Sequence, residues 1–168
     1  LFPLYPEETR QVRLQVQRDG EWVEVASQPV NDIGWATCFR IRGWDAARDT
    51  PYRLRHGDSA VFEGVVRKAP KKREIVLAAL SCNSSKDRGL RPNYVRNLRH
   101  QDPDLLFFAG DQSYDHRQHT AAWLKFGLQF RDVFRDRPCI PIPDDHDVGH
   151  ANWWGESGGV AKLPGGAD

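Results

Sequence analysis

The stretch that most constrains the fold is 105–115, which reads LLFFAGDQSYD. Its four consecutive apolar residues, 105–108, are typical of a strand that is covered on both faces of a parallel sheet. The chain must turn at Ala109-Gly110, and the side chains of Asp111, Tyr114 and Asp115 then offer oxygen atoms just beyond the strand. Ligands of open α/β sheets bind at that end of a strand. The stretch therefore predicts both a buried strand and a functional site.

Two other stretches repeat this plan of an apolar run followed by polar side chains. The run 74–80 is followed by Ser81-Cys82-Asn83, and the run 139–143 is followed by the DDHD segment at 144–147. Parallel strands of one sheet bring their carboxyl ends to the same edge. We therefore expect the polar side chains that follow the three runs to lie close together.

The residues between the three runs show the spacing of helices. The segment 93–100 is plausibly helical, and apolar side chains follow a helical period from 121 to 135, with Thr120 as the expected N-cap. This order predicts parallel strands joined by right-handed crossovers. Everything after Asp144 is expected to be loop, and a loop of that length is typical of a functional segment.

The N-terminal part of the sequence has short runs in which apolar and polar side chains alternate. Val12, Leu14 and Val16 alternate with polar neighbours, and Asp19-Gly20 is a strong hairpin signal. Five strands are expected, at 11–17, 22–26, 35–43, 52–55 and 61–67. Because no helical period separates them, they predict an all-β sandwich domain over residues 1–70.

Composition and charge exclude several classes of protein. Lys and Arg number 24 and Asp and Glu 23, so the net charge of +1 gives no general attraction to nucleic acid or to an anionic membrane. No apolar run approaches the ~20 residues of a membrane-spanning helix. The three cysteines are too few and too scattered for a disulfide framework. The basic stretch 68–73, KAPKKR, is interpreted as a linker, so that a second domain covers residues 71–168.

Five side chains near the three strand ends form the expected site: Cys82, Asp111, Tyr114, Asp145 and His146. Carboxylates crowded with a thiol, a phenol and an imidazole are costly to assemble unless cations neutralise them. Thiolate and imidazole suit transition metals, whereas carboxylates also suit Ca²⁺ or Mg²⁺. The set therefore predicts a mixed site for two metals, which together clamp the attacking and leaving oxygens of a displacement at phosphorus.

Each of these residues also has an ordinary structural explanation. A lone Cys82 is more often a small buried residue, Asp111 after a glycine more often caps a turn, and Tyr114 more often packs. The acidic segment 144–147 also fits a solvated loop. The metal site is favoured because all of these side chains occupy equivalent ends of successive strands.

Several motifs resemble those of the alkaline phosphatase D (PhoD-like) metallophosphatase family. The segment 110–115, GDQSYD, is similar to its G-D-x-x-Y motif, and 144–156, DDHDVGHANWWGE, is similar to its D-D-H-D/E motif and the loop that follows. Ser81-Cys82 matches its S-C element. The segment 64–70 resembles the G-x-x-R/K-x-A-P run near the end of the family's N-terminal fibronectin- or immunoglobulin-like sandwich.

The resemblance implies a calcineurin-like phosphoesterase domain, a four-layer α/β/β/α sandwich, of which residues 71–168 are the N-terminal half. Asp111 would bridge two metals in it. Cys82 and Tyr114 would bind the metal expected to be ferric iron (Fe³⁺), and Asp145 would bind the second metal, expected to be calcium (Ca²⁺). The later His and Asp ligands of the family are absent from this sequence, so we expect the domain to be incomplete.

By the same resemblance, His146 would be the acid that helps the leaving group, and Asn152 would contact a metal or the substrate phosphate. The expected reaction is hydrolysis of small phosphate esters, mono- or diesters, by metal-activated hydroxide. The family is usually exported, which implies an extracellular or periplasmic protein. Two alternatives stay open: a non-catalytic relative that keeps the fold, and a cell-surface binding module that uses the β-sandwich.

Overall fold

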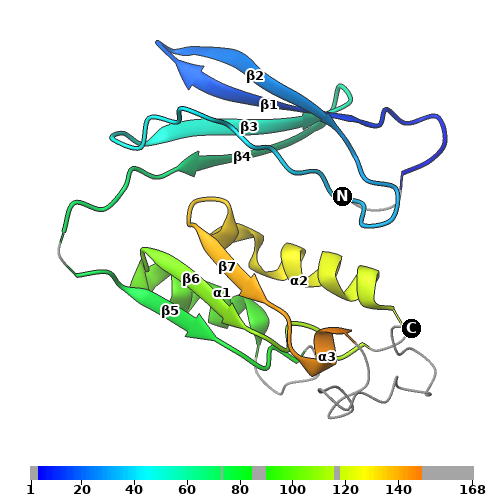
Figure 1. The fold of residues 1–168 in the computed structure, drawn as a ribbon, viewed down its shortest axis with the longest axis vertical. Coiled ribbons are helices and arrows are strands. Elements are labelled where there is room, and N and C mark those ends of the chain that lie inside the picture. Colours follow the sequence, from blue (N-terminus) through cyan, green and yellow to red (C-terminus); the bar gives the residue numbers. More distant parts are fainter. Residues whose placement is uncertain (1–3, 73, 85–89, 116–117, 149–168) are drawn as a thin grey trace. The chain divides into compact units, whose positions relative to one another are not determined.

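The computed structural model of the chain describes residues 4–72, 74–84, 90–115 and 118–148. The chain divides into two compact units, Leu1–Lys71 and Lys72–Asp168. Figure 1 shows the helices and strands of both units. Within the described ranges, no helix combines the length and the apolar character that crossing a bilayer requires.

The first unit contains a four-stranded antiparallel sheet in the order β2-β1-β3-β4. Its strands are β1 (Gln11–Arg18), β2 (Glu21–Pro29), β3 (Thr50–His56) and β4 (Ala60–Val66). The period-two alternation buries Val12, Leu14 and Val16 on one face of β1. Asp19 and Gly20 have positive φ angles of 51° and 88°, as a tight hairpin turn between β1 and β2 requires, and the predicted turn is confirmed.

The expected strand at 35–43 is wrong, because no residue of this segment lies in a strand. Asn31 folds the chain before it into a compact turn, in which its side chain accepts the N–H groups of Ile33 at 2.9 Å and Gly34 at 2.7 Å. Trp35 has a φ of 51°, which an extended strand excludes. The described residues of this unit therefore form one sheet of four strands, and the sandwich stays a prediction.

The second unit contains a three-stranded parallel sheet in the order β5-β6-β7. Its elements along the chain are β5 (Leu77–Leu80), α1 (Arg91–Gln101), β6 (Leu105–Ala109), α2 (His119–Phe134), β7 (Cys139–Ile142) and α3 (Asp145–Val148). Phe107 of β6 lies opposite Ala79 of β5 and Ile140 of β7. The predicted parallel strands with a helix between each pair are confirmed, and the carboxyl ends of the strands lie at one edge (Figure 1).

The hydrophobic core of this unit lies where the two long helices, α1 and α2, cover one face of the sheet. Leu106 and Phe108 alternate onto that face of β6 and are both 0% exposed. The ring of Phe108 meets the ring of Phe126 edge to face, with centroids 5.0 Å apart. Val95 and Leu98 of α1 complete the same cluster.

The opposite face of the sheet is apolar but open in the part of the chain that the structure describes. Leu77 is 51% exposed, Ile140 is 49% exposed and Ile142 is 44% exposed. Phe107 on the central strand is only half-buried. The expectation that the strand at 105–108 is covered on both faces therefore holds for one face of the described sheet.

Two helix starts differ from the sequence-based expectation. Helix α2 begins at His119, so Thr120 lies inside its first turn and is not the N-cap. The expected loop after Asp144 begins instead with the short helix α3. The reason is a reciprocal pair of hydrogen bonds. Asp147 Oδ2 accepts the Asp144 N–H at 3.1 Å, as the N3 side chain does in a capping box, and the Asp147 N–H donates to the Asp144 backbone carbonyl at 3.0 Å.

We predict that Phe108→Ala destabilises the second unit by about 3–5 kcal/mol, because it removes a fully buried ring and leaves a cavity. The matched control is Ile140→Ala on the open face, for which the expected loss is about 1 kcal/mol or less. Urea titration followed by circular dichroism measures both free energies of unfolding. Equal losses for the two variants would contradict the placement of the core on the helical face.

Candidate metal centre

The chain segments that follow β5 and β6 run beside each other past the ends of these strands. The Cys82 N–H donates to the Gly110 carbonyl at 3.2 Å, and the Asn83 N–H donates to the Asp111 carbonyl at 2.9 Å. Cys82 and Asp111 have φ angles of 55° and 57°. This left-handed conformation costs of order 1–3 kcal/mol outside glycine and clusters at functional sites. The backbone bonds hold the Cys82 and Asp111 side chains beside each other.

The Asp111 carboxylate is the centre of the polar cluster at this edge. The residue is only 8% exposed, and its Oδ2 accepts the Tyr114 hydroxyl at 3.0 Å and the Cys82 thiol at 3.6 Å. Its Oδ1 is buried without a hydrogen-bond partner among the described residues. A buried carboxylate oxygen that lacks a partner is unfavourable. A bound cation would supply the missing interaction.

Asp145 and His146 reach the same point from helix α3. One potential ligand atom each from Asp111, Asp145 and His146 lies within 4.8 Å of the other two. The His146 ring also lies against the Tyr114 ring, with centroids 4.2 Å apart and planes inclined by 38°. Because Tyr114 and Cys82 both contact Asp111, the five residues expected from the sequence lie in one connected cluster.

Gly110 lets the ends of β6 and β7 approach each other. Its φ of 94° lies in the region that favours glycine. A Cβ built on Gly110 would overlap the Cβ of Asp144 and would lie 3.3 Å from both its Cγ and its backbone N. The close approach carries Asp145, the next residue along the chain, toward Asp111.

Asp147 is a positioning residue that the sequence-based reasoning did not single out. It is 6% exposed, and its carboxylate accepts the Ser113 N–H at 2.9 Å and the Asp144 N–H at 3.1 Å. Burial raises the pKa of Asp147, and the backbone N–H groups that it accepts offset part of that rise. The carboxylate thereby joins the loop after β6 to the start of α3. The D-x-x-D spacing of Asp144 and Asp147 is the signal in the sequence from which this pair could have been predicted.

Two further side chains hold the loops around the cluster. Gln112 Nε2 donates to the Ile142 carbonyl at 2.8 Å and ties the loop after β6 to the end of β7. Arg91, at the start of α1, donates to Asn83 Oδ1 at 3.5 Å and to the Ser84 carbonyl at 2.7 Å. Neither residue belongs to a spacing pattern, so the sequence alone gave no signal for these contacts.

The pKa of Tyr114 is raised well above its usual range. Burial is the largest cause, and hydrogen bonds with Cys82 and Asp111 and the negative charge of Asp111 add to it. Without a cation the cluster therefore keeps its phenol protonated. A metal ion bound here would instead favour the deprotonated phenol, because a cation stabilises phenolate, thiolate and carboxylate ligands together.

The donor set of the cluster fits a metal ion. It combines a thiol, a phenol, an imidazole and two carboxylates with a buried carboxylate oxygen that has no described partner. Asn152, the expected contact of metal or phosphate, lies outside the described residues. The roles of Cys82, Tyr114 and the other residues as ligands stay predictions, which the geometry accommodates.

The fold is similar to those of two solved structures, one of PhoD and one of a purple acid phosphatase, and the expected resemblance to PhoD is confirmed at the level of the fold. The structure matches that of PhoD over 96% of this chain and 36% of that chain, with a TM-score of 0.67 and 15% sequence identity. It matches the purple acid phosphatase from yellow lupin (Lupinus luteus) seeds over 80% of this chain and 30% of that chain, with a TM-score of 0.56 and 14% identity.

These matches rest on the fold and not on close sequence similarity. No family model matches the sequence, and no curated protein matches it. The chain corresponds to 36% of the length of PhoD and 30% of the length of the lupin phosphatase. The comparison therefore assigns a phosphatase-like fold, and the activity is a separate question.

We predict that Gly110→Ala disrupts the candidate metal centre, because the added Cβ meets Asp144 and the backbone has a φ of 94°. The expected loss of stability is about 1–3 kcal/mol, the cost of a strained backbone position. Gly127→Ala in helix α2 is the matched control: its Cβ meets nothing within 4 Å, and a gain of about 0.5–1 kcal/mol is expected. Thermal unfolding measures both, and a neutral Gly110→Ala would show that the two strand ends do not need this approach.

Proposed function

We propose that this chain supplies part of the active site of a metal-dependent phosphoesterase of the alkaline phosphatase D type, which hydrolyses small phosphate esters. The observation that carries the proposal is the convergence of Asp111, Asp145 and His146, whose ligand atoms lie within 4.8 Å of one another. The similarity of the fold to two phosphatases supports it. Because the chain corresponds to 36% of PhoD, we propose that further metal ligands come from residues other than those described.

Four of the five clustered side chains would be ligands for two kinds of metal. Cys82 and Tyr114 offer sulfur and phenol oxygen and would hold Fe³⁺, Asp145 offers carboxylate oxygen and would hold Ca²⁺, and Asp111 would bridge the two. When bound, such ions activate water and neutralise the charge that develops on the phosphoryl group. The contacts of Asp111 with both Cys82 and Tyr114 support its central place.

His146 would act as the acid that protonates the leaving oxygen. An imidazole suits this role because its protonation changes near neutral pH. Helix α3 carries it to the cluster, and its ring contact with Tyr114 at 4.2 Å restrains its orientation. Asn152 would contact the phosphate or a metal.

The open apolar face of the sheet supports a larger architecture. Parallel sheets are normally covered on both faces, whereas Leu77, Ile140 and Ile142 are about half exposed here. We propose that a second sheet covers this face to give the four-layer α/β/β/α sandwich. The N-terminal sheet would then belong to a fibronectin- or immunoglobulin-like sandwich, and the protein would act in an extracellular or periplasmic compartment.

Asp111→Asn is expected to remove bound metal and phosphoesterase activity together. The reason is that it removes the negative charge of the carboxylate proposed to bridge the two metals. Mutation of residues that only hydrogen-bond to metal ligands typically lowers metal affinity or activity by about 10–100-fold. For Asp111, a proposed ligand, we therefore expect activity to fall by about 100-fold or more. Elemental analysis by mass spectrometry gives the metal content, and p-nitrophenyl phosphate and its bis-ester give the activity. Asp115→Asn, the same change at an exposed position of the same loop, is the control.

Three outcomes of this experiment are informative. Full metal content and full activity in Asp111→Asn would refute the proposed centre. A wild-type protein that binds phosphate without metal or turnover would be a non-catalytic relative with the same fold. Metal binding without hydrolysis of either ester would keep the centre and reject the proposed substrate class.

His146→Ala is expected to retain metal and to slow hydrolysis most for esters with poor leaving groups, because only these need a proton on the departing oxygen. The rate ratio between an alkyl phosphate and p-nitrophenyl phosphate should fall by about 10²-fold or more. Loss of metal in this variant would instead make His146 a ligand, in agreement with its place beside Asp111 and Asp145.

A further inference from the structure

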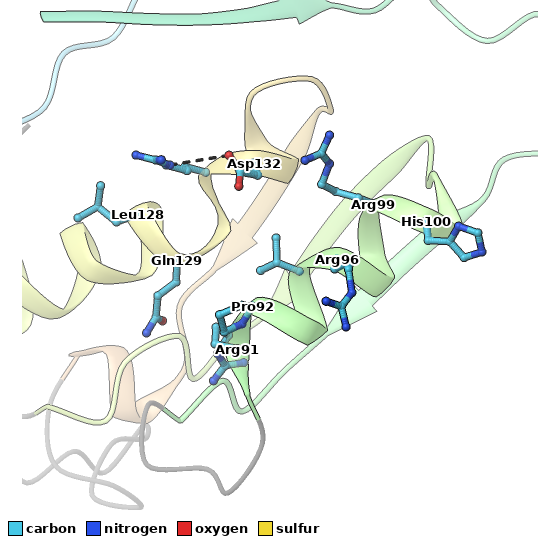
Figure 2. Close-up of a pocket in the computed structure, with 10 residues that line it drawn as sticks. Arg91, Pro92, Arg96, Arg99, His100, Leu128, Gln129 and Asp132 are labelled. Atoms are coloured by element: carbon cyan, nitrogen blue, oxygen red, sulfur yellow. Dashed lines mark ion pairs between the residues drawn. The ribbon is translucent and has the colours of Figure 1, made fainter.

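A groove runs between α1 and α2 on the helical side of the second unit (Figure 2). Its volume is about 940 Å³. Arg96 and Arg99 of α1 line it from one side, and Leu128 and Arg131 of α2 line it from the other. None of the five residues of the candidate metal centre is among the described residues that line the groove, so its chemistry is independent of that site.

The groove is strongly basic. Helix α1 reads RPNYVRNLRHQ and contains no acidic residue. In the part of the chain that the structure describes, the side chains of Arg96 and Arg99 make no hydrogen bond or ion pair. Asp132, the one acidic residue among the described lining residues, already lies 3.8 Å from Arg131 and 4.0 Å from Arg135. Arg96 and Arg99 of α1 therefore have no described counter-charge.

The groove also has apolar surface between its cations. Pro92 and Val95 of α1 and Leu128 of α2 line it. Leu128 is 44% exposed, whereas Val95 is 7% exposed and belongs to the core cluster. A ligand that carries only charge would leave this apolar surface in water. The better fit is a ligand that alternates acidic and apolar groups.

We propose that this groove binds an acidic peptide segment of a partner protein, with carboxylates paired to Arg96, Arg99 and Arg131 and an apolar side chain against Leu128. Helix α1 has 11 residues and is therefore about 16 Å long. An extended segment of about five residues spans that length. Guanidinium groups pair with carboxylates in a planar, two-bond geometry, which suits recognition of Asp and Glu.

The groove fits an acidic peptide better than it fits single-stranded nucleic acid or an anionic membrane, the two other kinds of anionic partner. Single-stranded nucleic acid is held largely by stacking of bases on aromatic rings, and no Phe, Tyr or Trp is among the described residues that line the groove. A membrane presents a flat array of headgroups, whereas the lining residues of this groove, cationic and apolar, come from two neighbouring helices. Charge and shape together therefore favour a narrow acidic segment.

The test is fluorescence anisotropy with the whole chain and a fluorescein-labelled peptide of sequence LEDLED. A peptide in which Gln and Asn replace the acids, LQNLQN, is the neutral probe. We expect LEDLED to bind and LQNLQN not to bind. The affinity for LEDLED should be higher at low salt, because salt screens exposed charges over a distance of about 8 Å at physiological ionic strength. The double variant Arg96→Gln/Arg99→Gln should weaken it about tenfold, because each exposed pair supplies a factor of a few.

The matched control is Arg40→Gln/Arg42→Gln, which removes the same charge from exposed positions of the other compact unit and should leave the affinity unchanged. Leu128→Gln tests the apolar contact and should also weaken binding, with the folded state of each variant checked by circular dichroism. Equal effects of the two double variants, or equal binding of LEDLED and LQNLQN, would overturn the proposal. Binding of an oligonucleotide or of phosphatidylglycerol vesicles, but not of LEDLED, would assign the groove to another class of partner and overturn it as well.

Discussion

The candidate metal centre depends on one buried carboxylate, that of Asp147, which ligates nothing in the proposed scheme. It accepts backbone N–H groups from Ser113, in the loop after β6, and from Asp144, at the start of α3. These bonds stabilise a charge that burial disfavours. Because Asp145 and His146 lie between Asp144 and Asp147 in sequence, these bonds restrain their position relative to the loop that carries Asp111 without a bound ion.

The rest of the unit gives this edge a rigid support. Phe108 anchors the central strand in an aromatic cluster, and the strand ends two residues before the strained backbone of Asp111. Strain at Cys82 and Asp111 is tolerated because ladder-like bonds continue past the ends of β5 and β6. Packing on one face of the sheet thus stabilises an unfavourable backbone at its edge, which is a common arrangement at functional sites.

Much of this could be predicted from the sequence, because apolar runs followed by polar residues require parallel strands with a common edge. The grouping of Asp111, Asp145 and His146 follows from that topology. Contacts that depend on backbone detail could not be predicted. The strand expected at 35–43 is prevented by hydrogen bonds of the Asn31 side chain, and the first turn of α3 depends on the reciprocal Asp144–Asp147 pair. Local sequence patterns likewise do not predict which segment covers the open face of the sheet.

Two features of the second unit are left unsatisfied by the described residues. The buried Oδ1 of Asp111 has no described partner, and the apolar face of the sheet has no described cover. A layer packed on that face would exclude water from the adjoining strand ends, where a lower dielectric strengthens every charge interaction. Cation binding would then become more favourable for Asp111 and would displace the proton of Tyr114, whose pKa is raised, so metal affinity should rise with pH. A cover on the open face of the sheet would in this way raise the affinity of the strand ends for a metal ion.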